Sequence, residues 1–293
     1  MVPVFSAVMP RYLPSDSASP DVHVIAFGEA AVGKLCIPLP QLGPQRLVES
    51  WDLPAGELFF GAAFSEGSGP LARETHELYD GMLTEARAAG FPWFVRMWNH
   101  VGSVNAEDDG MERYRLFCAG RHEAFVAAGY HNGADLPAAS AVGMSGRGLA
   151  TYFLAAREPG IQIENPRQMA AYRYPPRYGP KSPSFSRATL WRDTLFVSGT
   201  SSVVGHESVH IGDVEGQLDE TVRNIETVIA QAFPGRGLET VVAAKTYIRR
   251  ASDYDLIARK LDAIFPSNLY LESDICREEL LLETEVVAVV GSG

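Results

Sequence analysis

The chain has 293 residues and a formal net charge of −11 at pH 7. Hydrophobic residues make up 46% and charged residues 21% of the sequence, which is typical of a globular protein and excludes a disordered or fibrous one. The negative charge disfavours nucleic acids and anionic membranes as partners, because both are bound through basic surfaces. No apolar run approaches the roughly 18 residues that span a bilayer, so we expect no membrane protein.

The beginning of the chain and its cysteines indicate a cytoplasmic protein. The opening MVPVFSAVMPRYLPSD has no basic segment before an apolar core, so we expect no secretory signal. The cysteines, Cys36, Cys118 and Cys276, are odd in number and far apart. This spacing argues against a disulfide framework or a structural zinc site and fits a reducing compartment.

The first part of the chain, residues 1–160, predicts one unit of strands and helices. In chain order we expect a strand at Leu58–Ala62, a helix from about Pro70 to Ala88, a strand at Trp93–Trp98, a long helix with apolar residues at helical spacing from Met111 to Phe125, and strands at Ala138–Met144 and Leu149–Ala155. The glycine-rich segment Gly143–Gly148 between the last two strands predicts a hairpin.

A cationic loop follows, from Asn165 to Arg192. It contains six cations, five prolines and three tyrosines, and no Asp or Glu. The prolines exclude a helix, so we expect an extended segment. In a chain of negative net charge, such a loop indicates a local site for a small anion. The alternative is a solvated interdomain linker, although linkers seldom place aromatic residues beside arginines.

The rest of the chain, residues 161–293, repeats the order of the first part. We expect a strand at Leu195–Ser198, a helix capped by Asp213, a strand at Val241–Ile248, a helix at Asp253–Phe265, and strands at Leu269–Ile275 and Leu280–Val290. The predicted fold class is therefore α+β, with two units that are each a mixed β-sheet with helices packed on one face.

The segment His206-Glu207-Ser208-Val209-His210 matches the zinc-protease pattern H-E-x-x-H. That chemistry needs a helix, so that both imidazoles project from one face. Here the segment follows a strand and Gly205, the next helix starts only at Asp213, and no histidine lies downstream as a third ligand. We therefore expect a loop and no metal.

Two glutamates in the last predicted strand are better candidates for chemistry. Glu283 and Glu285 lie in the apolar run LLLETEVVAVV, and strand alternation places both on one face. A desolvated carboxyl group has a raised pKa and is suited to donate a proton. The alternative is that both pair with arginines at the rim of a sheet. The run Ser198-Gly199-Thr200-Ser201-Ser202 either presents hydroxyl groups to a ligand or forms an ordinary turn.

At this point the sequence resembles a known family, the chorismatases. The resemblance is carried by FVRMWNHVGSVN, DGMERYRLFCAGRHEAF, ENPRQMAAYRYPPRYGPKSPSFSRA, LFVSGTSSVVGH and DICREELLLE, from about Trp93 to the C-terminus. The family's C-terminal half is similar to the RidA/YjgF fold, which is chorismate-mutase-like, and its N-terminal half is a degenerate relative. The resemblance implies a cofactor-free enzyme of secondary metabolism that acts on chorismate.

The resemblance also implies roles for particular residues. Glu283 is implied as the general acid, and Cys276 and the turn around Ser201 as the positions that select the product. The implied substrate-binding residues are Tyr172, Arg173, Tyr178, Arg187, Thr200, Ser201 and Arg249. The arginines would hold the two carboxylates of chorismate through charge-assisted hydrogen bonds.

The implied product is pyruvate together with 3-hydroxybenzoate, formed by intramolecular displacement. Cys276 fits this type, whereas Ser201 stands where the family has alanine after SGT. The alternative is hydrolysis to a trans-dihydroxycyclohexadiene carboxylate. A non-catalytic RidA-like binding protein is a rival from another class. An imine deaminase is disfavoured because Asn268 stands where RidA proteins place an arginine. The oligomeric state is left open between a monomer and a small homo-oligomer such as a trimer.

Overall fold

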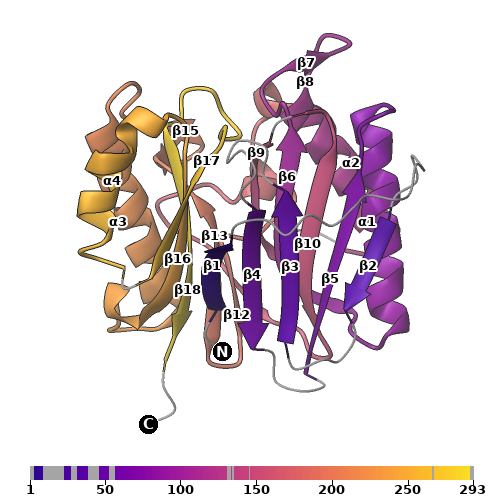
Figure 1. Ribbon diagram of the computed structural model, residues 1–293, viewed down its shortest axis with the longest axis horizontal. Coiled ribbons are helices and arrows are strands. Elements are labelled where there is room, and N and C mark those ends of the chain that lie inside the picture. Colours follow the sequence, from indigo (N-terminus) through magenta and orange to yellow (C-terminus); the bar gives the residue numbers. More distant parts are fainter. Residues whose placement is uncertain are drawn as a thin grey trace.

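The computed structural model describes residues 57–290, except residues 131, 132, 134, 145 and 266, together with the backbone of four strands nearer the N-terminus. It confirms the α+β class and the arrangement of two sheets with helices on one face of each (Figure 1). The helices lie on the outer sides of the molecule, so the inner faces of the two sheets point toward each other. Among the described residues, no helix is both long and apolar enough to cross a membrane.

The N-terminal unit is built on a five-stranded sheet with the order β2-β5-β10-β6-β9. Its strands are β2 (His23–Phe27), β5 (Leu58–Ser65), β6 (Trp93–Gly102), β9 (Ala138–Met144) and β10 (Leu149–Ala156). Helices α1 (Leu71–Ala88) and α2 (Arg113–Ala127) cover the outer face and bury an aromatic core against it. The short strands β7 (Glu107–Asp108) and β8 (Met111–Glu112) form a hairpin that projects above the sheet (Figure 1).

The prediction of a hairpin at Gly143–Gly148 is wrong. β9 and β10 are not paired with each other, because β6 lies between them, antiparallel to β10 and parallel to β9. The glycine-rich segment therefore crosses over the end of β6. The backbone of Arg147 comes so close to Gly102 that a Cβ there would lie 2.6 Å from its carbonyl carbon. Glycines permit this close backbone approach. They are equally common in tight turns, so the sequence pattern does not distinguish a crossover from a hairpin.

The C-terminal unit is built on a six-stranded sheet with the order β11-β12-β13-β18-β16-β17. Its strands are β11 (Ile161–Ile163), β12 (Ala188–Trp191), β13 (Thr194–Thr200), β16 (Val241–Ile248), β17 (Asn268–Glu272) and β18 (Leu282–Val289). Helices α3 (Val214–Ala232) and α4 (Tyr254–Leu261) cover its outer face. Asp213 caps α3 as predicted, accepting a hydrogen bond from the Gly216 amide at 3.0 Å.

Three predicted elements of this unit are shorter in the structure. α4 ends four residues before the predicted Phe265, because the amides of Ile264 and Phe265 both bond to the carbonyl of Leu261 and turn the chain. β17 ends at Glu272 and β18 begins at Leu282, so residues 273–281 form a connection outside the sheet. This connection forms part of the candidate site.

The two units meet along their inner faces. The amide of Ala139 on β9 donates to the Ser198 hydroxyl of β13 at 2.8 Å, which places these strands side by side. Large aromatic side chains fill the space between the sheets, and Trp98 stacks on Tyr152 with ring centroids 4.7 Å apart. A three-stranded sheet, β1-β4-β3, lies in front of the junction in Figure 1 and comprises β1 (Pro3–Val8), β4 (Arg46–Asp52) and β3 (Val32–Pro38).

Candidate active site

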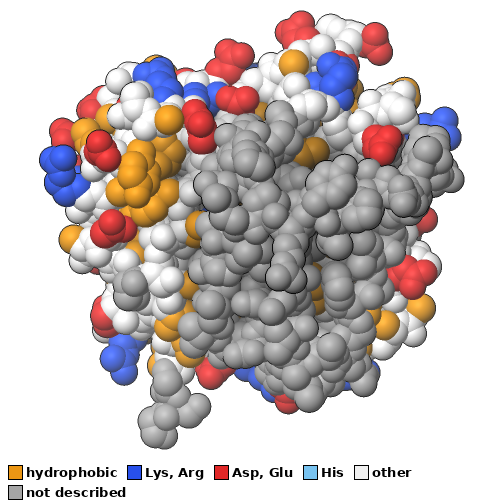
Figure 2. Space-filling model, in the orientation of Figure 1, with side chains coloured by type: hydrophobic (Ala, Val, Ile, Leu, Met, Phe, Trp, Pro, Cys, Tyr) orange, Lys and Arg blue, Asp and Glu red, His pale blue; other side chains and the backbone are white. Residues whose placement is uncertain are grey.

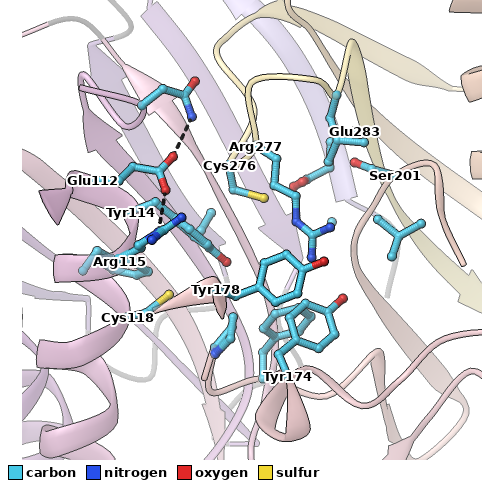
Figure 3. Close-up of a pocket in the computed structure, with 18 of the residues that line it drawn as sticks. Glu112, Tyr114, Arg115, Cys118, Tyr174, Tyr178, Ser201, Cys276, Arg277 and Glu283 are labelled. Carbon is cyan, nitrogen blue, oxygen red and sulfur yellow. Dashed lines mark hydrogen bonds and ion pairs between the residues drawn. The ribbon is translucent and has the colours of Figure 1, made fainter. Parts of the chain in front are cut away.

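A cavity of about 480 Å³ lies between the two units, and both contribute to its walls (Figure 3). α2 and β9 form the N-terminal side. The cationic loop, the end of β13 and residues 276–283 form the C-terminal side. The size is typical of a small-molecule site. Residues that line it include Tyr114, Cys118, Arg121, Ser140, Tyr174, Tyr178, Phe185, Arg187, Gly199, Ser201, Cys276, Arg277 and Glu283.

Glu283 reaches the cavity from β18. Its side chain is only 4% exposed, and among the described residues its Oε1 has no hydrogen-bond partner. Burial, together with the nearby Glu285, raises the pKa of this carboxyl group to about 8. Gly199 makes room for it, since a Cβ at that position would overlap with Oε1 of Glu283. At neutral pH the cavity therefore contains a carboxylic acid with a proton to donate.

Glu285 lies on the same face of β18, as the alternation predicts, but in a different environment. Burial alone would raise its pKa, but Lys245 and Arg96 lower it to about 2. Arg96 and Trp98 donate to its oxygens at 2.7 and 2.6 Å, and Lys245 lies 3.0 Å away. Two neighbouring glutamates with opposite pKa shifts are the usual arrangement of an acid beside a permanent anion.

Arg187 contributes positive charge to the cavity wall. One of its guanidinium nitrogens donates to the carbonyl of Met169 and to the Tyr174 hydroxyl, each at 2.8 Å. Its Nε has no hydrogen-bond partner among the described residues. The guanidinium group lies over the ring of Phe185, 5.4 Å from the centroid. Two bonds thus hold Arg187 in place while a donor is left for a ligand.

Arg277 extends the cationic wall from the connection before β18. Its guanidinium group lies 4.4 Å from the ring centroid of Tyr178 and donates to the carbonyl of His206 at 3.0 Å. Tyr178 also donates to that carbonyl, at 2.6 Å. The carbonyl of His206 therefore holds both side chains at the cavity, where Figure 3 shows Arg277 and Tyr178 close together.

Arg121 is the most unusual cation in the wall. It is 2% exposed, yet its Nε and Nη2 have no hydrogen-bond partner in the described part of the chain. Its guanidinium group lies near the rings of Tyr79, Phe117 and Phe125, at 5.3 to 6.0 Å from their centroids. A buried charge without a counter-ion is costly, so the position favours an anion bound in the cavity.

Two cysteines and a tyrosine form the remaining wall. Burial raises the pKa of Cys118 to about 12 and raises the pKa of Cys276 even more, so both thiols stay protonated at neutral pH. Burial also holds the pKa of Tyr114 well above its ordinary value. A protonated thiol is a poor nucleophile. These side chains therefore shape the cavity as neutral groups.

The structure brings five of the predicted site residues to the cavity. They are Glu283, Cys276, Tyr178, Arg187 and Ser201. The hydroxyl of Ser201 is buried without a hydrogen-bond partner among the described residues, and Figure 3 shows it beside Glu283. It is therefore available to a ligand or to the Glu283 carboxyl group, whose charged form it favours.

Four predicted binding residues do not line the cavity. Tyr172 packs against Gly133 in the N-terminal unit, Arg173 is exposed above the Tyr172 ring, and Thr200 donates to the carbonyl of Ser198. Arg249 donates to the carbonyls of Leu280, Ile275 and Arg277 and pairs with Asp274. Its donors are occupied in holding the 274–281 connection, so it positions the wall and does not face a ligand.

The sequence interpretation missed Arg121, Arg277, Tyr174, Tyr114 and Cys118. A signal for Arg121 was present, because it lies midway between Phe117 and Phe125 at four-residue spacing, on the buried stripe of α2. An arginine on an apolar stripe needs a partner or a function. Arg277 directly follows Cys276, but nothing in the sequence indicates that its side chain points into the cavity.

The flanking residues predict a loop for the H-E-x-x-H segment, and the segment is not helical. Glu207 and Ser208 form the short strand β15 (Glu207–Ser208), which pairs with β14 (Val203–Val204), and His210 lies beyond this hairpin. His206 Nδ1 lies 2.9 Å from a guanidinium nitrogen of Arg177 and 3.2 Å from the Tyr178 hydroxyl. The two histidines do not share a helix face, so the geometry of a zinc protease is not formed.

Comparisons with known proteins agree with this geometry. The family model "Chorismatase FkbO/Hyg5-like, N-terminal" matches residues 50–155. The chain is 38% identical over 254 residues to a 3-hydroxybenzoate synthase of Streptomyces hygroscopicus, covering 80% of this chain and 74% of that one. It is also 38% identical over 250 residues to a chorismatase of Streptomyces rapamycinicus, covering 79% and 74%.

Among solved structures, the chain is similar to the crystal structure of a chorismatase. The TM-score is 0.76 at 29% identity, and the match covers 98% of each chain. Sequence and structure thus agree over most of the chain, including both units that enclose the cavity. The chain belongs to the chorismatase family.

Proposed function

We propose that the protein converts chorismate to pyruvate and 3-hydroxybenzoate, with Glu283 as the general acid. The observation that carries this proposal is the buried, protonated carboxyl group of Glu283 in a cavity with a cationic wall. An enol ether is stable until its methylene carbon is protonated. The cavity supplies the required proton donor.

The first step transfers the Glu283 proton to the methylene carbon of the enolpyruvyl group. The side chain becomes an oxocarbenium ion and Glu283 a carboxylate. The neighbouring ring hydroxyl oxygen then bonds to the ring carbon that bears the side chain, the bond from that carbon to the side-chain oxygen breaks, and pyruvate leaves. The hydroxyl proton returns to Glu283. The older C–O bond of the resulting epoxide then breaks, so that the oxygen stays on the carbon that carried the side chain, and this carbon loses its proton as the ring aromatises and the oxygen is protonated. The reaction consumes no water and is redox-neutral overall.

The cationic wall is suited to a dianion. Arg187 and Arg121 have free donors in the described structure, and Arg277 extends the positive charge. Charge-assisted bonds from guanidinium groups to carboxylates are strong and directional. Fixing both carboxylates would hold the methylene carbon against Glu283, which adds an orientational contribution to the acid catalysis.

The product follows from the neutral wall. Protonated Cys118 and Cys276 do not activate a water molecule, which favours the intramolecular route. The relative named 3-hydroxybenzoate synthase supports the same product. Hydrolysis to a trans-dihydroxycyclohexadiene carboxylate is the second candidate, because the unpaired Ser201 hydroxyl offers a bonding site for water.

We further propose that the protein works in the cytoplasm. Cys118 and Cys276 are free thiols, and the net charge of −11 does not suit nucleic acids or anionic lipids. Chorismate is the proposed small-molecule partner. A separate measurement of the molar mass in solution would distinguish a monomer from a small homo-oligomer such as a trimer.

The test is incubation of the purified protein with chorismate. Pyruvate is followed with lactate dehydrogenase, and the aromatic product is identified by chromatography against authentic standards. We expect equal amounts of pyruvate and 3-hydroxybenzoate. Pyruvate with the dihydroxy acid would establish the hydrolytic alternative. Binding of chorismate without any pyruvate would contradict the enzyme assignment and leave a binding protein.

A further inference from the structure

Glu285 and its partners form a buried charged cluster behind the cavity. Its Oε2 accepts from Arg96 at 2.7 Å and from Ser140 at 2.5 Å, and its Oε1 accepts from Trp98 at 2.6 Å. Lys245 lies 3.0 Å from Oε1. Two cations on β6 and β16 thus fix one carboxylate in its charged form, two residues along β18 from Glu283.

Ser140 connects this cluster to the cavity. Its oxygen accepts hydrogen bonds from Arg96 at 2.5 Å and from the Gly199 amide at 3.0 Å. A hydroxyl group has two acceptor positions and one proton. With both acceptor positions filled, the proton of Ser140 is committed to Glu285. Ser140 lines the cavity, and its single proton is donated to Glu285 and not to Glu283.

We propose that Glu285 is a positioning residue that keeps the proton on Glu283, by its fixed negative charge and by holding the Ser140 hydroxyl away from Glu283. This inference rests on the proposed role of Glu283 as the acid. It adds that the acid depends on a neighbour that never touches the substrate, and that the charge of this neighbour sets the upper pH limit of activity.

The groups around Glu283 act in opposite directions. Burial and Glu285 favour the protonated form, whereas Arg96 on β6, Ser201 after β13 and Arg187 in the cationic loop favour the charged form. Cys276, on the connection, is neutral because burial raises its pKa, and Tyr247 on β16 is the cross-strand neighbour of Glu283. His100 on β6 is also neutral, because burial lowers its pKa to about 3. Of the charged groups, Glu285 has the largest effect.

The size of the effect follows from the strand geometry. Residues two apart on one face of a strand are separated by about 6.6 Å. At the effective dielectric constant of about 20 that fits buried sites, a unit charge at this distance shifts a pKa by about one to two units. Removing the charge of Glu285 is expected to lower the pKa of Glu283 by that amount.

The first experiment does not use turnover. The carboxyl C=O stretch of Glu283 is followed by infrared difference spectroscopy of the ligand-free protein as a function of pH, with Glu283→Gln to identify the band. In Glu285→Gln we expect the midpoint of the band to move down by about one to two pH units. An unchanged midpoint in a folded variant would overturn the proposal, whatever reaction the protein catalyses.

A second variant covers the case that Glu285→Gln does not fold. Glu285→Gln/Lys245→Met removes one charge of each sign, so the net charge of the cluster is kept. In this double variant the midpoint of the Glu283 band should also move down, but by less than in Glu285→Gln. Lys245→Met alone is the matched control, and its midpoint should stay unchanged or move up. A downward shift in this control would contradict the proposal, because it would show that the shift does not depend on the negative charge of Glu285.

The pH profile of kcat/KM is the third readout. Its alkaline limb should move down in Glu285→Gln by the same amount as the infrared midpoint. If the infrared midpoint shifts but the limb does not, the charge effect stands and Glu283 is not the acid that limits the rate. If neither shifts, the charge effect itself is wrong.

Discussion

The cavity and the Glu285 cluster are two neighbouring charged regions on one face of β18, and they differ in how their polar groups are paired. In the cluster, Glu285 accepts from several donors and its charge is matched by two cations. In the cavity, donors and acceptors of Glu283, Arg121, Arg187 and Ser201 have no partner among the described residues. Buried polar groups are normally paired. The unpaired groups of the cavity are therefore available to a ligand, whereas the paired groups of the cluster hold the fold.

Replacing the proposed acid tests the role of the cavity most directly. Glu283→Gln keeps the shape of the side chain but has no acidic proton, so turnover should fall about 10²- to 10⁴-fold. Chorismate binding, measured by isothermal titration calorimetry, should change little. Full activity of this variant would refute the acid assignment.

Removing a cation from the Glu285 cluster should lower the free energy of unfolding. Arg96→Met leaves Glu285 with one cation fewer in a buried site, and breaking such a pair costs about 3–5 kcal/mol. The free energy of unfolding by urea measures this loss. Arg73→Met is the control, because the exposed Arg73–Glu77 pair is worth about 1 kcal/mol or less. Equal losses in the two variants would contradict the structural role of the cluster.

Arg121 tests whether the unpaired groups of the cavity bind the substrate, because it is buried but has no hydrogen-bond partner in the described structure. Arg121→Met should weaken chorismate binding about 10- to 100-fold, the value of a lost charge-assisted hydrogen bond. The free energy of unfolding should stay the same or rise. Binding can be measured in the Glu283→Gln background, where the substrate is not consumed. Unchanged affinity would remove Arg121 from the binding site.

The smallest expected effect is the pH dependence. Glu283 must be protonated to act and has a pKa of about 8, so kcat/KM should fall above pH 8, by about tenfold at pH 9. Because the folded protein keeps this proton at pH values where the unfolded chain has lost it, stability should fall as the pH rises from about 4.5 to 8. Glu283→Gln should lack this part of the pH dependence. A flat rate profile to pH 10 would contradict the raised pKa.

Local patterns were sufficient to predict most elements. β9 and β16 have the predicted bounds, α3 is capped by Asp213, and Glu283 and Glu285 share a face of β18. Period and capping depend on nearby residues, so a single sequence carries them. The strand order could not be predicted from these local patterns. The glycine-rich Gly143–Gly148 segment resembles a hairpin in sequence, and only the pairing of β6 with both β9 and β10 shows that the segment is a crossover.

Residue type and spacing along the chain were enough to indicate the fold class, two candidate carboxyl groups on one strand face and a cationic loop, because these features depend on nearby residues. Only the tertiary structure decided which arginines face the cavity. Arg249 is occupied by the carbonyls of residues 275, 277 and 280, whereas two nitrogens of Arg121, from the other unit, have no hydrogen-bond partner among the described residues. It also decided which glutamate keeps its proton. Glu283 and Glu285 are alike in sequence, and they differ because two cations and a serine from other strands contact only one of them.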